Sequence, residues 1–173
     1  MIDAHAHCYP QEFVNLLVKE GEANGAKMGR TSTGDPVVQS VPGGAQASVM
    51  RRNMTDFDLL LKEMEERQVD MYVLSMHNPM VYCAPPEFAL RLSQAANNAG
   101  SAAHLKYPQK FVGAIMLPLQ APKLAAQELP PFLHNSYPAG GERMKEFFMI
   151  RRGCCGRKYS KGDCNYLILL RLK

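Results

Sequence analysis

What the sequence lacks excludes several classes of protein. No apolar run approaches the roughly 18 residues that a membrane-spanning helix needs, and the longest candidate is the short stretch 166–170. Residues 1–20 show no basic segment followed by an apolar one, so we expect no secretory signal. The five cysteines are an odd number without the spacing of a disulfide framework, which favours a reducing compartment. We therefore expect a cytoplasmic protein with no membrane partner.

Most of the chain has no excess of positive charge, and the basic residues are concentrated near its end. Residues 1–129 hold eleven Lys/Arg against thirteen Asp/Glu, whereas residues 130–173 hold nine against three. The basic segment carries no recognisable nucleic-acid-reading motif, so we expect no nucleic-acid partner. It also shows no sustained hydrophobic period. Residues 130–173 are therefore interpreted as an irregular basic tail outside the main domain, 1–129.

The first part of the main domain has weak periodicity. Ile2–His7 is predicted to form a strand, and Pro10–Glu20 a short helix. Glycine and proline then interrupt residues 21–50, which predicts a long loop or inserted flap with one brief strand at Pro36–Val41.

Strands and helices alternate from Thr55 onward. The pattern predicts a helix from the N-cap at 55–56 through Arg67, a strand at 69–75, a helix from 85 to about 106, a strand at 111–117, and a helix beginning at 121–129. Pro130 and Pro131 are expected to stop that last helix. Alternation of this kind predicts an α/β fold with a parallel sheet and right-handed crossovers.

Two histidines, His5 and His7, stand two residues apart at the end of the first predicted strand. Side chains at this spacing share one face of a strand, about 7 Å apart between their Cα atoms. Two such imidazoles can bind one cation at about 2.0–2.1 Å. The alternative is a pair of solvated surface histidines. We predict a metal site here, and we interpret the adjacent Cys8 as a packing residue.

Three segments, "MIDAHAHCYPQEF", "LLLKEMEERQVDMYVLSMHNP" and "AHLKYPQKFVGAIMLPLQAPKLAAQEL", resemble the first third of amidohydrolase-related proteins. The branch is that of aminocarboxymuconate-semialdehyde decarboxylase and related carboxy-lyases. The resemblance covers about residues 1–129. It implies a (β/α)₈ TIM barrel with a divalent metal, above all zinc, in which His5 and His7 match the ligands of the first strand.

The same resemblance implies a small carboxylic-acid substrate held by arginine. Arg51 or Arg52 could match that residue, and the alternative is a solvated arginine pair before a helix. Of the other histidines, His104 is expected at the wrong end of the barrel and His134 in the tail. His77 lies at the correct end, although the family pattern places no ligand there.

An eight-stranded barrel takes roughly 250 residues, whereas this sequence supplies about three strand–helix units. We therefore expect an incomplete barrel. The leading hypothesis is a metal-dependent decarboxylase of small unsaturated or aromatic carboxylic acids, with this chain truncated and inactive. A metal-dependent hydrolase of a small ester, lactone or amide is the alternative. A third hypothesis is a non-catalytic fragment that interacts with a full-length homologue. The catalytic residues and homo-oligomer formation stay open.

Overall fold

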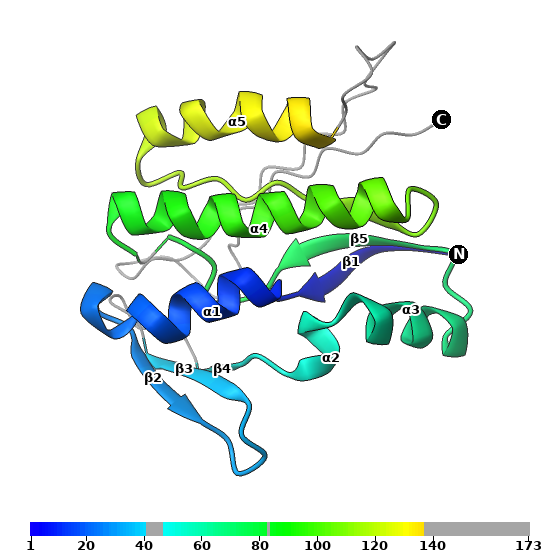
Figure 1. Cartoon of the computed structure of the whole chain (residues 1–173), viewed down its shortest axis with the longest axis horizontal. Coiled ribbons are helices and arrows are strands. Elements are labelled where there is room, and N and C mark those ends of the chain that lie inside the picture. Colours follow the sequence, from blue (N-terminus) through cyan, green and yellow to red (C-terminus); the bar gives the residue numbers. More distant parts are fainter. Residues whose placement is uncertain (41–46, 83, 137–173) are drawn as a thin grey trace, which may run out of the picture.

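A computed structural model (Figure 1) describes residues 1–40, 47–82 and 84–136. These residues contain two three-stranded sheets. The first sheet is parallel, in the order β1 (Ile2–Cys8), β5 (Met71–Met76) and β6 (Phe111–Gly113). The second is antiparallel, in the order β2 (Lys27–Arg30), β3 (Pro36–Ser40) and β4 (Ser48–Val49). The parallel sheet confirms the predicted α/β class.

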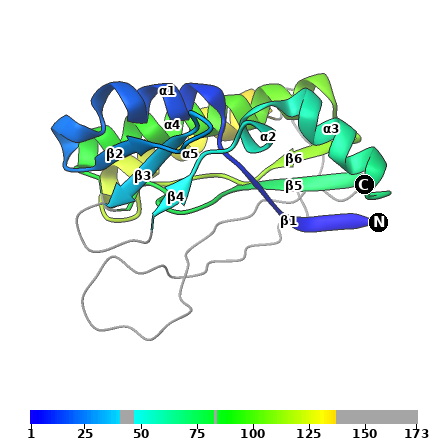
Figure 2. The same ribbon diagram turned by 90° about the horizontal axis from the view of Figure 1, so that it is seen from below.

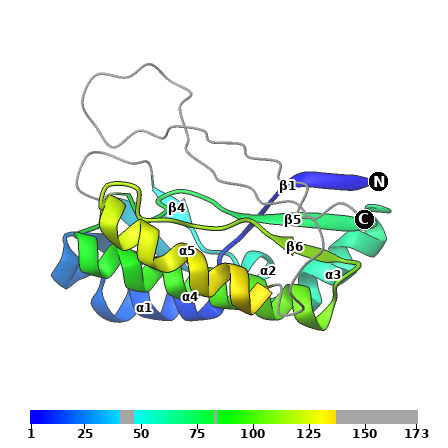
Figure 3. The same cartoon turned by 90° about the horizontal axis from the view of Figure 1, so that it is seen from above.

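The helices gather on one side of the parallel sheet. They are α1 (Gln11–Glu20), the 3₁₀ turn η1 (Glu22–Asn24), α2 (Arg52–Thr55), α3 (Phe57–Glu66), α4 (Pro86–Lys106) and α5 (Pro122–Ser136). Figures 2 and 3 show α1, α3, α4 and α5 on the same face of this sheet. Within the described ranges, no helix is both long and apolar enough to cross a membrane.

The chain between β1 and β5 shows how local sequence sets one helix. Asp56 caps α3, and its Oδ1 accepts hydrogen bonds from the backbone N–H groups of Asp58 at 3.0 Å and Leu59 at 3.3 Å. Leu60 and Met64, four residues apart, are buried on one side of the helix against the strands. The predicted helix and its N-cap are confirmed.

Helix α4 approaches β6 through two glycines. A Cβ atom added to Gly113 would lie 3.3 Å from the Cα of Gly100, which is backbone of the facing helix. The absence of both side chains lets helix and strand backbones pack closely. This contact fixes the central helix on the sheet.

The third strand is shorter than predicted and ends at Gly113. Beyond it, the backbone of Met116 binds a side chain. Asn97 Nδ2 donates to Met116 O at 2.9 Å, and Asn97 Oδ1 accepts from Met116 N at 2.7 Å. Asn97 Nδ2 also donates to Glu128 Oε1 at 2.8 Å, joining α4 to α5. The side-chain amide of Asn97 therefore makes the backbone hydrogen bonds to Met116 that a neighbouring strand would otherwise make.

The expectation that Pro130 and Pro131 end the last helix is wrong, because α5 continues through both to Ser136. Each proline removes one backbone hydrogen bond, but α5 packs along α4, where Ala125 and Glu128 are buried. Tertiary packing overrides the local preference. The first residues of the predicted tail are thus helical, and residues 137–173 lie outside the described part.

The described part of segment 21–50 contains three strands where the sequence predicted one. Strands β2 and β3 are joined by a turn in which Gly34 has a φ of +87°, a value that favours glycine. Val38 of β3 and Met50 after β4 are buried in the same apolar cluster as Tyr9 and Phe13. The antiparallel sheet therefore contributes to the main core.

Candidate metal centre

His5 and His7 lie side by side near the carboxyl end of β1. Their ring centroids are 4.4 Å apart, and the ring planes meet at 72°. His5 is exposed, whereas His7 is half-buried, with its Nδ1 3.4 Å from Ser75 Oγ on the neighbouring strand. The structure thus brings the two predicted ligands together at one edge of the sheet.

A third imidazole, that of His77, completes the cluster. His77 directly follows β5, and its ring centroid is 4.6 Å from that of His7. Its Nδ1 lies 3.1 Å from the hydroxyl oxygen of the fully buried Tyr9, and that hydroxyl donates to the carbonyl oxygen of Asn78. Sequence reasoning gave His77 little weight. The available signal was its position after the strand beside β1, since adjacent parallel strands end at one edge.

The protonation of His7 suits metal binding. Partial burial, followed by the proximity of His77 and of His5, lowers the pKa of His7 to about 4. The ring is therefore neutral at pH 7 and retains a lone pair, the form in which imidazole binds a metal. Among the described residues, however, no group of three or more His, Cys, Asp and Glu side chains could hold a metal ion. The donor set present is a pair of histidines.

A hollow of about 290 Å³ adjoins the histidine pair. Its walls come from β1, α2, α3 and β5, and its lining residues are Asp3, His5, Ala6, His7, Asn53, Met54, Leu60, Glu63, Arg67 and Tyr72. It contains both acidic and basic side chains beside the imidazoles. This is the polar cavity that the site offers to a small molecule.

The candidate substrate residues Arg51 and Arg52 are the N-cap and the first residue of α2, and both are exposed. Arg52 lies 3.9 Å from Asp56, and its side chain is 82 % exposed. The same short helix reaches the site through Met54, whose carbonyl oxygen accepts a 2.7 Å hydrogen bond from Tyr9 N. The arginines therefore lie on an element at the site, although neither lines the hollow.

The remaining candidates lie elsewhere. His104 Nδ1 is 2.8 Å from the carbonyl oxygen of Phe111, the first residue of β6, so His104 is at the opposite end of the sheet, as expected. Cys8 is buried among apolar residues, which raises its pKa to about 12 and is consistent with a packing role. His134 is in the last turn of α5, and its side chain is outside the described part.

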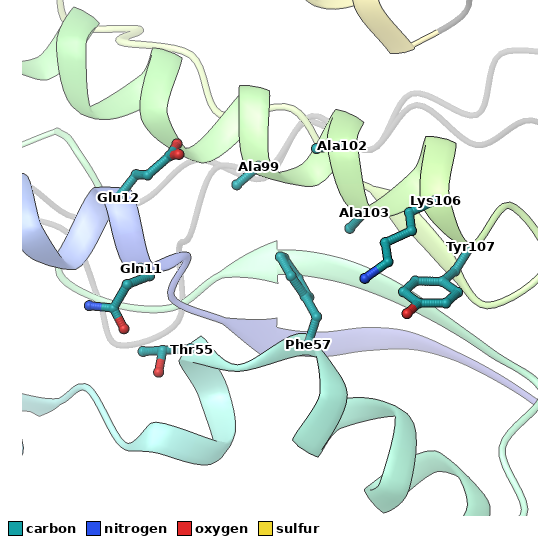
Figure 4. Close-up of a pocket in the computed structure, with 9 residues that line it drawn as sticks. All are labelled: Gln11, Glu12, Thr55, Phe57, Ala99, Ala102, Ala103, Lys106 and Tyr107. Atoms are coloured by element: carbon teal, nitrogen blue, oxygen red, sulfur yellow. The ribbon is translucent and has the colours of Figure 1, made fainter.

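A second hollow, of about 280 Å³, lies between helices (Figure 4). Its lining residues are Gln11, Glu12, Thr55, Phe57, Ala99, Ala102, Ala103, Lys106 and Tyr107. Alanines of α4 and Phe57 form an apolar surface, and Lys106 Nζ is 4.9 Å from the centroid of the Tyr107 ring. The residues that line this hollow include no histidine or cysteine.

The chain is similar to two characterised decarboxylases. It is 34 % identical over 90 residues to gamma-resorcylate decarboxylase of Rhodococcus jostii (strain RHA1), a match covering 51 % of this chain and 27 % of that protein. It is 29 % identical over 129 residues to 2-amino-3-carboxymuconate-6-semialdehyde decarboxylase of Dictyostelium discoideum, covering 74 % and 35 %. The resemblance found in the sequence is confirmed, and the chain spans about a third or less of each relative.

Solved structures share the fold. One is the apo form of Metarhizium anisopliae IDCase, with a TM-score of 0.59 and 18 % identity over 75 % of this chain and 38 % of that one. Another is a dihydroxybenzoic acid decarboxylase from Polaromonas sp. JS666 with bound manganese, with a TM-score of 0.50 and 22 % identity, covering 76 % and 34 %. No protein-family profile matches the chain.

Proposed function

We propose that this chain carries the first metal-binding segment of a divalent-metal-dependent decarboxylase that acts on small aromatic or unsaturated carboxylic acids. The observation that carries the proposal is the pair His5 and His7, with ring centroids 4.4 Å apart, at the carboxyl end of a parallel strand. Similarity to two decarboxylases supports the reaction type.

The arrangement of the described strands supports an incomplete TIM barrel. Strands β1, β5 and β6 are parallel, their order across the sheet follows their order in the chain, and the helices lie on one face. A barrel has this order, whereas a doubly wound sheet has helices on both faces. In barrels the active site is at the carboxyl ends of the strands. This is the edge at which His5, His7 and His77 meet.

The residues that would hold the cation are His5 and His7. Neutral imidazoles suit zinc, and we propose zinc as the metal, while one structurally similar decarboxylase holds manganese. The cation would supply Lewis-acid polarisation of substrate oxygen atoms. The half-buried His7 ring, supported by Ser75 Oγ at 3.4 Å, fixes one ligand before any cation arrives.

The substrate is proposed to be a small carboxylic acid, of the kind named in the similar decarboxylases. A planar guanidinium suits a carboxylate because it can donate two parallel hydrogen bonds. Arg51 and Arg52 are proposed for this task because α2 is held at the site by the Tyr9–Met54 backbone hydrogen bond. Cytoplasmic location is part of the proposal and is supported by cysteine usage alone.

We further propose that the 173-residue chain does not turn over substrate by itself. The described residues place three parallel strands around the site, and they offer two ligands where a catalytic zinc usually has three from the protein. Turnover also needs a cavity that excludes water and holds the substrate in place. Those requirements would have to be met from outside the described part.

The test has two arms. In calorimetric titration with zinc, we expect binding no tighter than micromolar, lost in the His5→Ala/His7→Ala double variant; binding that survives the double change would overturn the metal site. In the second arm, the purified chain with zinc or manganese is assayed for CO₂ release from 2,6-dihydroxybenzoate and related acids. We expect none. Release that depends on His5 and His7 would overturn the proposed inactivity, and hydrolysis of an ester or lactone would replace decarboxylation as the function.

A further inference from the structure

Asp3 lies on a different face of β1 from the one that simple alternation predicts. The register pairs Asp3 with Tyr72 and Ala6 with Leu74, so β1 contains one residue more than β5 over this stretch. Such an extra residue is a β-bulge. Ala6, Tyr72 and Leu74 belong to the apolar cluster that faces α3, and Asp3 shares that face. In a regular strand Asp3 would share the face of His5 and His7.

Two interactions hold Asp3 at the bulge. Its Oδ1 accepts a hydrogen bond from the backbone N–H of His5 at 3.0 Å, and its Oδ2 lies 3.7 Å from Arg67 Nη2. A bond from an Asp side chain to the N–H two residues ahead offers the backbone an alternative to regular strand pairing. The carboxylate of Asp3 thus binds the residue that carries the first proposed ligand.

Arg67 is itself held in place by its neighbours. Its Nη1 donates to Glu63 Oε1 and to Tyr72 Oη, each at 3.0 Å. The guanidinium carbon lies 5.9 Å from the centroid of the Tyr72 ring, and Tyr72 is only 1 % exposed. Arg67 is therefore oriented by α3 and β5, and through Asp3 it connects both elements to β1. All four residues line the hollow that contains His5 and His7.

We propose that Asp3, held by Arg67, is a positioning residue for the metal-binding pair: it fixes the bulge in β1 and thereby sets His5 beside His7. This inference rests on the proposed function for its metal. Without the carboxylate, the N–H of His5 loses its side-chain acceptor, and the backbone of the bulge, which lies between Asp3 and Ala6, loses the contact that holds it. His5 then loses its fixed position relative to His7. Groups that orient ligands without touching the metal typically contribute 10–100-fold to affinity.

The first test is calorimetric titration with zinc at pH 7. We expect Asp3→Ala to weaken zinc binding about tenfold. Asp3→Asn should lose less affinity, because its amide oxygen can still accept from His5 N–H. The zinc affinity of Arg67→Met should lie between those of Asp3→Ala and Asp3→Asn. Arg91→Met is the matched control, since Arg91 forms a bidentate pair with Glu20, at 2.6 and 2.8 Å, between α4 and α1. It should bind zinc like the unmodified chain. Equal affinity in Asp3→Ala and the unmodified chain would overturn the proposal.

The second test needs no metal. Hydrogen exchange of the His5 amide, measured by NMR, should be about tenfold faster in Asp3→Ala than in the unmodified chain. In Asp3→Asn the exchange rate should lie between those two values. If the unmodified chain fails to bind zinc but exchange follows this order, the proposed function fails while the role of Asp3 in setting the strand stands. Unchanged exchange in Asp3→Ala would refute that role. If Asp3→Ala does not fold, both tests can still be made on Asp3→Asn, because the two side chains have nearly the same shape.

Discussion

Two polar clusters in this molecule differ in burial and in hydrogen bonding: one surrounds Asn97 and the other surrounds His7. Around Asn97, which is 2 % exposed, the amide oxygen and nitrogen are both bound, to the backbone of Met116 and to Glu128. Around His7, which burial and its neighbours keep neutral, two further imidazoles gather at a partly exposed strand end. A closed buried network contributes to stability and to a single packing, whereas neutral imidazoles offer lone pairs to a cation. The Asn97 network therefore serves stability, whereas the imidazoles around His7 are the candidates for binding a cation.

The sharpest way to break the comparison is to remove the imidazoles of the second cluster. His5→Ala/His7→Ala should abolish zinc binding, measured by calorimetry, with little change in the free energy of unfolding because His5 is exposed and His7 half-buried. His104→Ala is the control, since His104 binds Phe111 O at the other end of the sheet, and it should leave zinc affinity unchanged. Loss of zinc binding in His104→Ala would show that the effect is not specific to the pair.

The converse change concerns Asn97. Asn97→Ala should lower the free energy of unfolding by about 3 kcal/mol, because it leaves the backbone of Met116 and the buried Glu128 without their partner. Urea denaturation measures this loss, and calorimetry should show zinc affinity unchanged. The adjacent Asn98 is exposed, so Asn98→Ala is a matched control with little expected effect. Equal destabilisation by the two changes would contradict the role of the buried network.

The contact between α4 and β6 predicts a smaller difference. Gly113→Ala places a Cβ at 3.3 Å from backbone atoms of Gly100, which cannot move as a side-chain end can, and should cost about 1–2 kcal/mol. Gly100→Ala meets only an ordinary 3.6 Å contact, and it gains helix propensity of up to about 1 kcal/mol. Thermal unfolding of the two variants should therefore shift in opposite directions. A stabilising Gly113→Ala would show that the two backbones are not closely packed.

The histidine cluster also predicts a pH dependence. His7 has a pKa of about 4 in the folded chain, below the ordinary value of about 6.5 in an unfolded chain. The unfolded chain therefore takes up this proton first, and the stability that the neutral ring contributes is lost as pH falls from about 6.5 to about 4. NMR titration of the His7 ring should give a midpoint near the lower value. His77→Asn should raise that midpoint, whereas an unchanged midpoint would assign the whole shift to burial and His5.

Much of this architecture could be predicted from local sequence. The His5 and His7 spacing, the Asp56 cap, the buried strand β5 and the Pro85–Pro86 start of α4 all act within a few residues, so their signals are visible in the chain. The resemblance of three segments to decarboxylases identified the same edge of the sheet. These features needed no knowledge of which elements touch.

The features that could not be predicted depend on distant contacts. The bulge in β1 places Asp3 on the α3 face, where its carboxylate lies 3.7 Å from Arg67, a residue 64 positions away in the sequence. The continuation of α5 through Pro130 and Pro131 depends on packing against α4. His77 lies beside His7 because β1 pairs with β5, and this pairing is not visible in the sequence. In each case a contact with a residue distant in the sequence accompanies the departure from the local pattern.

The buried hydroxyl of Tyr9 also determines where the proton of His77 resides. A phenol has a single proton to donate, and Tyr9 donates it to the carbonyl oxygen of Asn78. The 3.1 Å contact with His77 Nδ1 must then use the phenol oxygen as acceptor and Nδ1–H as donor. Neutral His77 is thereby held as the Nδ1–H tautomer, with its lone pair on Nε2. Tyr9 thus determines which ring nitrogen of neutral His77 carries the lone pair.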